Sequence, residues 1–80
     1  MKTIITQNGE TRECILKLGQ CVKHPKGFWG FIRMFGEDDK QRPRILMDRV
    51  GFSISKKYGV YPHELQLQYE DFNKGEIIEP

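Results

Sequence analysis

The sequence predicts a mostly β domain, and three observations lead to this class. Turn residues interrupt the chain at short intervals, as in small all-β proteins. Between the turns stand short runs in which apolar and polar residues alternate, the pattern of a half-buried strand. No stretch has the spacing of a convincing amphipathic helix. Because 80 residues make one domain with a thin core, about six or seven short strands would have to share that core.

The first elements are expected to form a hairpin. Residues 2–6 are a β-branched run, and residues 11–16 would be the returning strand. Asn8 and Gly9 stand between them, and this pair favours a two-residue turn because both residues tolerate a positive φ angle. Leu18 and Gly19 then break the chain.

Further strands are expected in the middle of the chain. They are predicted at residues 20–24, 28–35, 44–48 and 52–56, with turns at 25–27, 49–51 and 57–59 and a charged loop at 36–43. Alternation places Val22 on the opposite face from its neighbours, and Ile45 and Met47 opposite Leu46. Gly30, inside an apolar strand, indicates a bulge or a close backbone approach.

The last third of the chain has a different pattern, with a predicted helical turn before the last strand. Pro62 suits the first position of a single 3₁₀ turn. Residues 66–69 would form the closing strand, with Leu65, Leu67 and Tyr69 on one face. We assign one domain to residues 1–72, with the hairpin at 1–16 and the barrel at 17–69, followed by an acidic, flexible tail at 73–80. Ile77 and Ile78 in this tail could pair at a sheet edge.

The order of elements resembles the SH3-like small barrels over residues 17–69. Residues 18–25 resemble their glycine-containing entry strand, residues 27–32 their Gly-x-x-Gly-x-Ile strand, and residues 61–67 their closing 3₁₀ turn. Similar patterns occur in KOW-type and Tudor-like modules and in accessory-subunit barrels such as the variable chain of ferredoxin–thioredoxin reductase. The resemblance implies a partly open barrel of five or six strands, with an N-terminal hairpin added. A shared fold alone does not settle function. A second argument favours a barrel that is fully closed, because a sheet that closes on itself has no exposed edge strands.

Charge is distributed unevenly along the chain. Residues 17–57 carry ten Lys and Arg against four Asp and Glu, whereas residues 58–80 carry one Lys against five acidic residues. A basic segment with interleaved aromatic residues favours an anionic partner. A solvated surface with scattered charge is the competing interpretation.

The candidate binding residues lie in this basic segment. They are Lys23, His24, Lys26, Trp29, Arg33, Arg42, Arg44, Lys56, Lys57 and Tyr58. Arginine suits phosphate because its planar fork makes two hydrogen bonds, and an exposed tryptophan can stack on a base or dock a protein. In the competing interpretation, Trp29 lies half-buried over the core.

We therefore expect a non-catalytic binding module that docks onto nucleic acid or a nucleic-acid-bound complex. The alternative is a protein-interaction or accessory-subunit module without nucleic-acid contact, and edge-strand pairing could also give a homodimer. An enzyme is disfavoured, because no two convergent polar groups stand out. No cofactor or metal site is expected, since the spacing of Cys14, Cys21 and His24 fits no compact zinc site. The absence of a long apolar run or signal peptide favours a cytoplasmic protein with no membrane contact and reduced cysteines.

Overall fold

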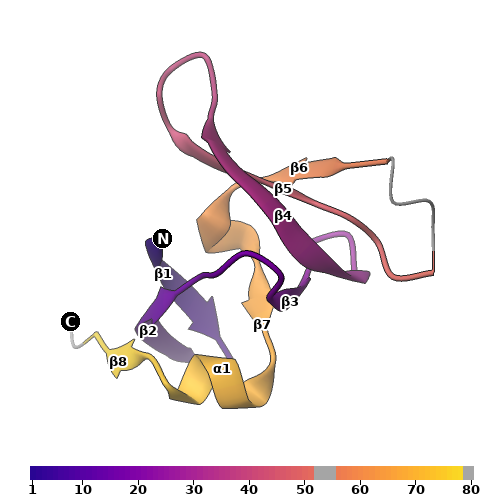
Figure 1. The fold of residues 1–80 in the computed structure, drawn as a ribbon. Coiled ribbons are helices and arrows are strands. Elements are labelled where there is room, and N and C mark those ends of the chain that lie inside the picture. The colour runs from indigo at the N-terminus through magenta and orange to yellow at the C-terminus, as the bar shows by residue number, and fades with distance from the viewer. Residues whose placement is uncertain (52–55, 79–80) are drawn as a thin grey trace.

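The computed structural model describes residues 1–51 and 56–78, and the protein is mostly β. The described strands form two antiparallel sheets (Figure 1). The first sheet has the order β1-β2-β8 and contains β1 (Lys2–Gln7), β2 (Glu10–Ile15) and β8 (Glu76–Ile77). The second has the order β6-β5-β4-β3-β7 and contains β3 (Cys21–Lys23), β4 (Trp29–Glu37), β5 (Pro43–Met47), β6 (Tyr58–Val60) and β7 (Gln66–Leu67). Two short helices, η1 (Pro62–Glu64) and α1 (Tyr69–Asn73), complete the chain.

The predicted N-terminal hairpin is confirmed. Asn8 and Gly9 have φ angles of 55° and 79°, and Gln7 pairs with Glu10 across the turn. This is the geometry of a two-residue turn whose twist matches that of the flanking strands. The hairpin continues beyond the strands, because Met1 and Leu16 exchange two backbone hydrogen bonds.

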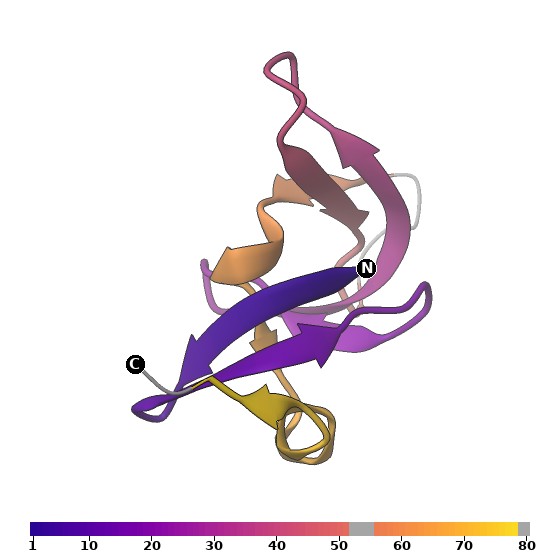
Figure 2. The same cartoon turned by 90° about the vertical axis from the view of Figure 1, so that its left-hand side faces the viewer.

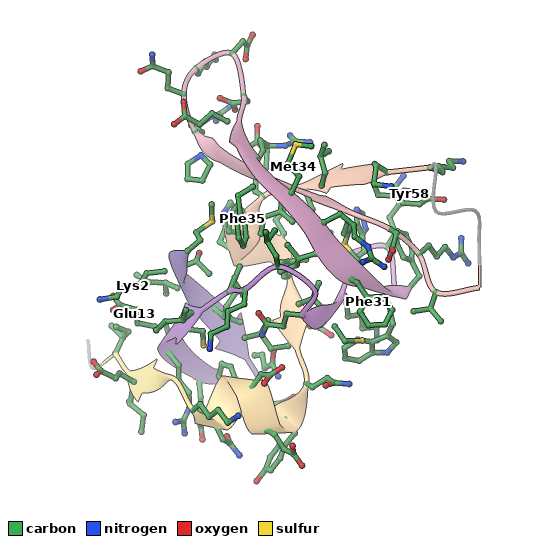
Figure 3. All side chains as sticks on the ribbon, in the orientation of Figure 1. Lys2, Glu13, Phe31, Met34, Phe35 and Tyr58 are labelled. Atoms are coloured by element: carbon green, nitrogen blue, oxygen red, sulfur yellow. The ribbon has the colours of Figure 1, made fainter. Side chains whose placement is uncertain are left out.

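A register shift in β4 decides which of its side chains reach the core. Ile32 pairs with Met47 and Met34 with Leu46, so Arg33 is an extra residue that interrupts the alternation. Ile32 on one side of this bulge and Phe35 on the other both pack into the core, although they are three residues apart. Met34 faces outward, and Figure 3 shows Met34 and Phe35 on opposite sides of β4.

Gly30 is needed for a close backbone approach, one of the two roles that the sequence indicates. A Cβ at residue 30 would overlap the carbonyl oxygen of Asp48 and lie 2.9 Å from the terminal methyl of Met47. Only glycine therefore lets β4 pack against the end of β5 at this point.

The described strands leave the fold open, as the predicted mostly β, partly open architecture requires, and only the full closure favoured by the argument from strand edges is wrong. No strand ladder joins the two sheets among the described residues. The amide of Gln7 bridges them instead: its Nε2 donates to the Leu67 carbonyl at 3.1 Å, and its Oε1 accepts from the Leu67 N–H at 2.9 Å. The core lies between the sheets and comprises Ile5, Cys14, Leu16, Val22, Ile32, Ile45, Met47, Val60, Leu65, Leu67 and Phe72.

Two local predictions fail, and one falls outside the described residues. The turn predicted at 57–59 is instead the start of β6, because Tyr58 pairs with Met47. The strand predicted at 66–69 ends at Leu67, and α1 begins at Tyr69, whose ring is 76% exposed rather than facing the core. The strand predicted at 52–56 lies mostly in residues 52–55, which the structure does not describe.

The remaining local predictions agree with the structure. Pro62 begins the 3₁₀ turn, and Ile77 pairs with Arg12 at the edge of the first sheet. Phe72 is the buried residue of α1 and anchors it to the core. The longer helix has five residues, so no helix in the described part of the chain is long and apolar enough to span a bilayer.

Replacing Gly30 should destabilise the protein, whereas the same change at Gly36 should not. We expect Gly30→Ala to lower the free energy of unfolding by about 1–3 kcal/mol, because the added methyl group overpacks the contact with Asp48. Gly36→Ala is the matched control in the same strand, because its Cβ would meet open space. Urea unfolding of the two variants measures the difference, and equal stabilities would contradict this packing argument.

Candidate functional site

The fold gathers most of the predicted binding residues at one end of the second sheet. Three segments meet there: the turn at 24–28, residues 48–50 after β5, and residues 56–58 at the start of β6. Lys23 pairs with Trp29, the Val50 N–H donates to the Trp29 carbonyl at 3.0 Å, and Tyr58 pairs with Met47. We call this region the basic end.

Aromatic rings close the core at the basic end. The rings of His24 and Phe28 stack with centroids 4.6 Å apart, and the Tyr58 ring lies 4.8 Å from that of Phe28. His24 is only 6% exposed, and its Nδ1 accepts the Lys26 N–H at 3.0 Å. His24 therefore shapes the 24–28 turn and is buried beneath the surface, unlike the exposed lysines predicted with it.

Cations lie over the outward sides of these rings. The Arg49 guanidinium is 4.9 Å from the Phe28 ring centroid, and the Lys56 ammonium is 5.4 Å from that of Tyr58. Such contacts hold a positive charge against an apolar surface without neutralising it. The Tyr58 ring thus lies under the Lys56 ammonium. Figure 3 shows Tyr58 at the β6 side of the sheet.

A buried carboxylate organises the neighbouring part of β4. Asp48 accepts the Phe31 N–H at 2.8 Å with one oxygen and the Arg33 Nε–H at 2.7 Å with the other. Burial acts to raise the pKa of Asp48, but these two hydrogen bonds and the positive charges of Arg33 and Lys57 outweigh it and lower the pKa below 3.8. Asp48 therefore stays ionised and fixes the Arg33 side chain in one orientation.

The outer face of the second sheet is apolar and basic at this end. Trp29 is 39% exposed, and Lys23 lies beside it on β3. Phe31 is half-buried on the same face, and the Arg33 guanidinium lies 5.4 Å from its ring centroid. Trp29 thus combines the two interpretations offered by the sequence, because it covers the sheet and also reaches solvent.

Charge at the basic end is almost entirely of one sign. The cations are Lys23, Lys26, Arg33, Arg49, Lys56 and Lys57. Asp48 is the one acidic residue among the described residues of this region, and it is buried against Arg33. The other described acidic residues lie on the first sheet, α1, η1 and the tip of the β4–β5 hairpin.

Two predicted binding residues do not belong to the basic end. Arg42 and Arg44 lie at the far end of the β4–β5 hairpin, which Figure 1 shows projecting away from β3. Arg42 donates to Asp38 at 2.9 Å, and the Arg44 guanidinium stacks 4.4 Å from the Tyr61 ring centroid. The structure therefore places Arg42 and Arg44 apart from the other predicted binding residues.

Arg42, Arg44 and Tyr61 form a second cluster at this end of the hairpin, and Asp38 holds it together by accepting hydrogen bonds from Arg42 and Tyr61. Desolvation acts to raise the pKa of Asp38, but hydrogen bonds from the Arg42 and Lys40 backbones, the Tyr61 hydroxyl and the Arg42 guanidinium lower it to about 2. One of the two arginine charges is therefore neutralised within the hairpin.

The chemistry available elsewhere in the described residues is limited. Burial is the main cause that raises the pKa of both Cys14 and Cys21, so both are protonated thiols at neutral pH. No group of three or more metal-ligating side chains occurs within residues 1–51 and 56–78. A groove of about 610 Å³ lies between β2 and α1, away from the basic end, and its walls carry charges of both signs.

Three contributors to the basic end were missed by reasoning from the sequence. Asp48 and Arg49 act through contacts between segments that lie far apart in the chain, whereas Phe31 contacts Arg33 within β4. The one available signal was Asp48 itself, which is the single acidic residue of the basic segment outside the 37–39 run.

No protein-family model, curated protein or solved structure matches this chain.

Neutralising Asp48 should destabilise the protein in a pH-dependent way. At pH 7 we expect Asp48→Asn to lower the free energy of unfolding by about 2 kcal/mol, because hydrogen bonds to a charged group are lost. The pKa of Asp48 is lower in the folded protein than its ordinary 3.8. The stabilisation is therefore complete above pH 3.8 and is lost as the pH falls through the folded pKa.

The measurement is chemical unfolding of both proteins at a series of pH values. The wild-type and Asp48→Asn curves should converge in acid. Asp39→Asn is the control, because Asp39 is exposed at the hairpin tip. Equal stability of wild type and Asp48→Asn at pH 7 would refute the role given to this carboxylate.

Proposed function

We propose that this chain is a non-catalytic binding module that docks onto nucleic acid through its basic end. The observation that carries the proposal is the charge of this region: six cations lie at the end of the second sheet where Trp29 is exposed, and the one acidic residue described there is buried and paired with Arg33. Lysine and arginine that contact phosphates release condensed counterions, which supplies affinity independent of sequence.

The distribution of charge over the described residues favours an orientation in which the basic end faces the nucleic acid. The acidic residues of the first sheet and of α1 repel a polyanion, whereas the basic end attracts it. Complementary charge of this kind steers encounter and fixes orientation more than it adds affinity. A nucleic acid approaching the molecule would therefore meet Lys23, Lys26 and Lys56 first.

Removing three lysines at the basic end should weaken binding to nucleic acid. It should also make the affinity less dependent on salt concentration. For Lys23→Ala/Lys26→Ala/Lys56→Ala, the slope of log K against log salt should become less steep by about 2, since each lost phosphate contact contributes about 0.7 for a single strand. The fluorescence of Trp29, the one tryptophan of the chain, reports binding directly. Titration with oligonucleotides at several salt concentrations measures this slope.

The matched control removes the same charge elsewhere. Lys17, Lys40 and Lys74 are exposed and lie outside the basic end, so their triple alanine variant should keep the wild-type slope. An equal loss in both variants would show that binding depends only on net charge. Failure of the wild-type protein to bind any oligonucleotide at low salt would end the proposal.

A second candidate function, a protein-interaction module, is favoured by the outer face of the first sheet. Figure 2 shows β1 and β2 in front, with no other described element covering them. Ile4, Ile15 and Ile78 are exposed on this face. Glu13 and Glu76 lie directly opposite each other without an ion-pair partner among the described residues, although like charges in that position repel.

The partner that fits this face is a second copy of the chain. Lys2 lies on the same face as Glu13, as Figure 3 shows, so a twofold axis can bring the lysine of each copy to the carboxylates of the other. The isoleucines would then pack between the two sheets at the usual spacing of about 10 Å. This dimer would use a sheet face and not the edge strand that the sequence suggested.

Charge reversal tests the dimer. Lys2→Glu should give a monomer by size-exclusion chromatography with light scattering, and so should Glu13→Lys/Glu76→Lys. Mixing the two variants should restore a heterodimer, because the charges are then complementary again. Lys40→Glu, at the hairpin tip, is the control. A wild-type protein that stays monomeric at high concentration would remove this candidate.

A further inference from the structure

We infer that the nucleic acid bound at the basic end is single-stranded, with its bases stacked on Trp29 and on the outward plane of the Arg33 guanidinium. This inference rests on the proposed function and narrows it to one class of ligand. Four features of the described residues support it: the spacing of the two platforms, the way Arg33 is held, the position of the cations, and the lack of net positive charge at the far end of the β4–β5 hairpin.

The two platforms lie side by side on one strand. The Arg33 guanidinium lies 5.4 Å from the centroid of the Phe31 ring, so Phe31 marks the position of the second platform. Trp29 and Phe31 are two residues apart and face outward from β4, so their backbones are separated by about 6.7 Å. Bases in a duplex are stacked about 3.4 Å apart, and their faces are covered by neighbouring bases. A ring at each of these positions can therefore receive only bases that have been separated from their stack, as they are in a single strand.

Arg33 forms the second platform because it is fixed on two sides. Its Nε–H donates to the buried Asp48 at 2.7 Å, and its guanidinium carbon lies 5.4 Å from the centroid of the Phe31 ring. The side chain remains 44% exposed. A guanidinium plane that is already immobilised offers a stacking surface to a base with little further loss of conformational entropy.

Cations lie where the backbone of a stacked strand would run. Lys23 is next to Trp29 across β3 and β4, and Lys26 lies in the turn that precedes Trp29. Phosphates that follow the bases along β4 would pass these side chains. This combination of stacking rings and bordering cations is how single strands are bound without readout of their sequence.

The element whose shape suits a duplex lacks a net positive charge. A two-stranded β ribbon can enter a major groove, and the projecting β4–β5 hairpin is such a ribbon (Figure 1). Its far end carries Glu37, Asp38 and Asp39 against Lys40, Arg42 and Arg44. Asp38 is moreover held as a carboxylate by its hydrogen bonds. The far end of the hairpin therefore offers no net attraction to the phosphates that border the groove.

The test compares three probes at the same salt concentration. They are a fluorescein-labelled oligothymidylate of about ten nucleotides, a duplex of the same length, and inorganic polyphosphate as a competitor without bases. We expect the single strand to bind about tenfold more tightly than the duplex, with quenching of Trp29. Polyphosphate should displace the single strand poorly, because it cannot use the two platforms.

Two variants separate stacking from charge. Trp29→Leu should weaken binding of the single strand about tenfold by fluorescence anisotropy and leave binding of the duplex nearly unchanged. Arg33→Lys keeps the positive charge but removes the planar group, and it should weaken single-strand binding several-fold. Arg44→Lys, at the far end of the hairpin, is its matched control and should bind as the wild type does. Circular dichroism verifies that each variant is folded.

The outcomes distinguish this inference from the function on which it rests. Duplex binding as tight as that of the single strand would overturn the single-strand assignment and leave nucleic-acid binding in place. Unchanged single-strand affinity of folded Trp29→Leu and Arg33→Lys would overturn the stacking platforms. No binding of either oligonucleotide at low salt would overturn the inference and the proposed function together.

Discussion

The fold and the basic end both depend on the contacts of one residue, Asp48. Its backbone N–H donates to the Phe31 carbonyl at 3.1 Å, and its carboxylate accepts the Phe31 N–H at 2.8 Å. Its own carbonyl packs against Gly30 so closely that no other residue fits there. A buried charge is costly unless every lone pair that it presents is used, and here the second oxygen is used by Arg33. The same carboxylate therefore ties the end of β5 to β4 and sets the orientation of a surface cation.

This arrangement explains why a thin core can coexist with an ordered surface. The domain has few fully buried side chains, so it has little interior with which to fix the position of long, flexible residues. Instead it orders cations individually: Arg33 by a carboxylate and a ring, Arg49 by Phe28, and Lys56 by Tyr58. Each contact reduces the conformational freedom of a charged side chain at the surface. The basic end is therefore more than an accumulation of lysines and arginines in the sequence.

Local chemistry made part of the structure predictable. Asn8 and Gly9 determined the first turn. Alternation separated Val22 from its neighbours, and Ile45 and Met47 from Leu46, and the structure buries these three residues in the core. The helix α1 could not be found in the same way, because its single turn buries one residue, Phe72, and one residue has no periodicity. Its first turn contains Glu70 and Asp71, which favour a helix start, but at the sequence level they read as an acidic tail.

The positive charge of the binding residues could be predicted from the sequence, but their positions in the fold could not. Charge along the chain includes Arg42 and Arg44 with the other cations, yet the antiparallel hairpin carries them to the opposite end of β4 from Trp29. Strand order could have revealed this, because the turn at 24–28 precedes β4 and the loop before Arg42 follows it. The contacts of Asp48 and Arg49 could not be foreseen, since they arise only when separate strands meet.

The bulge at Arg33 reconciles the requirements of the core with those of the surface. A regular strand from Trp29 to Glu37 would place every second residue inside, so Ile32 and Phe35 could not both reach the core. One extra residue changes the alternation, and that residue is the arginine that Asp48 then holds. Shifting the bulge by one position would bury a charge or expose an apolar ring. The position of Arg33 is thus fixed by packing below the sheet, and the surface above it takes its shape from the same irregularity.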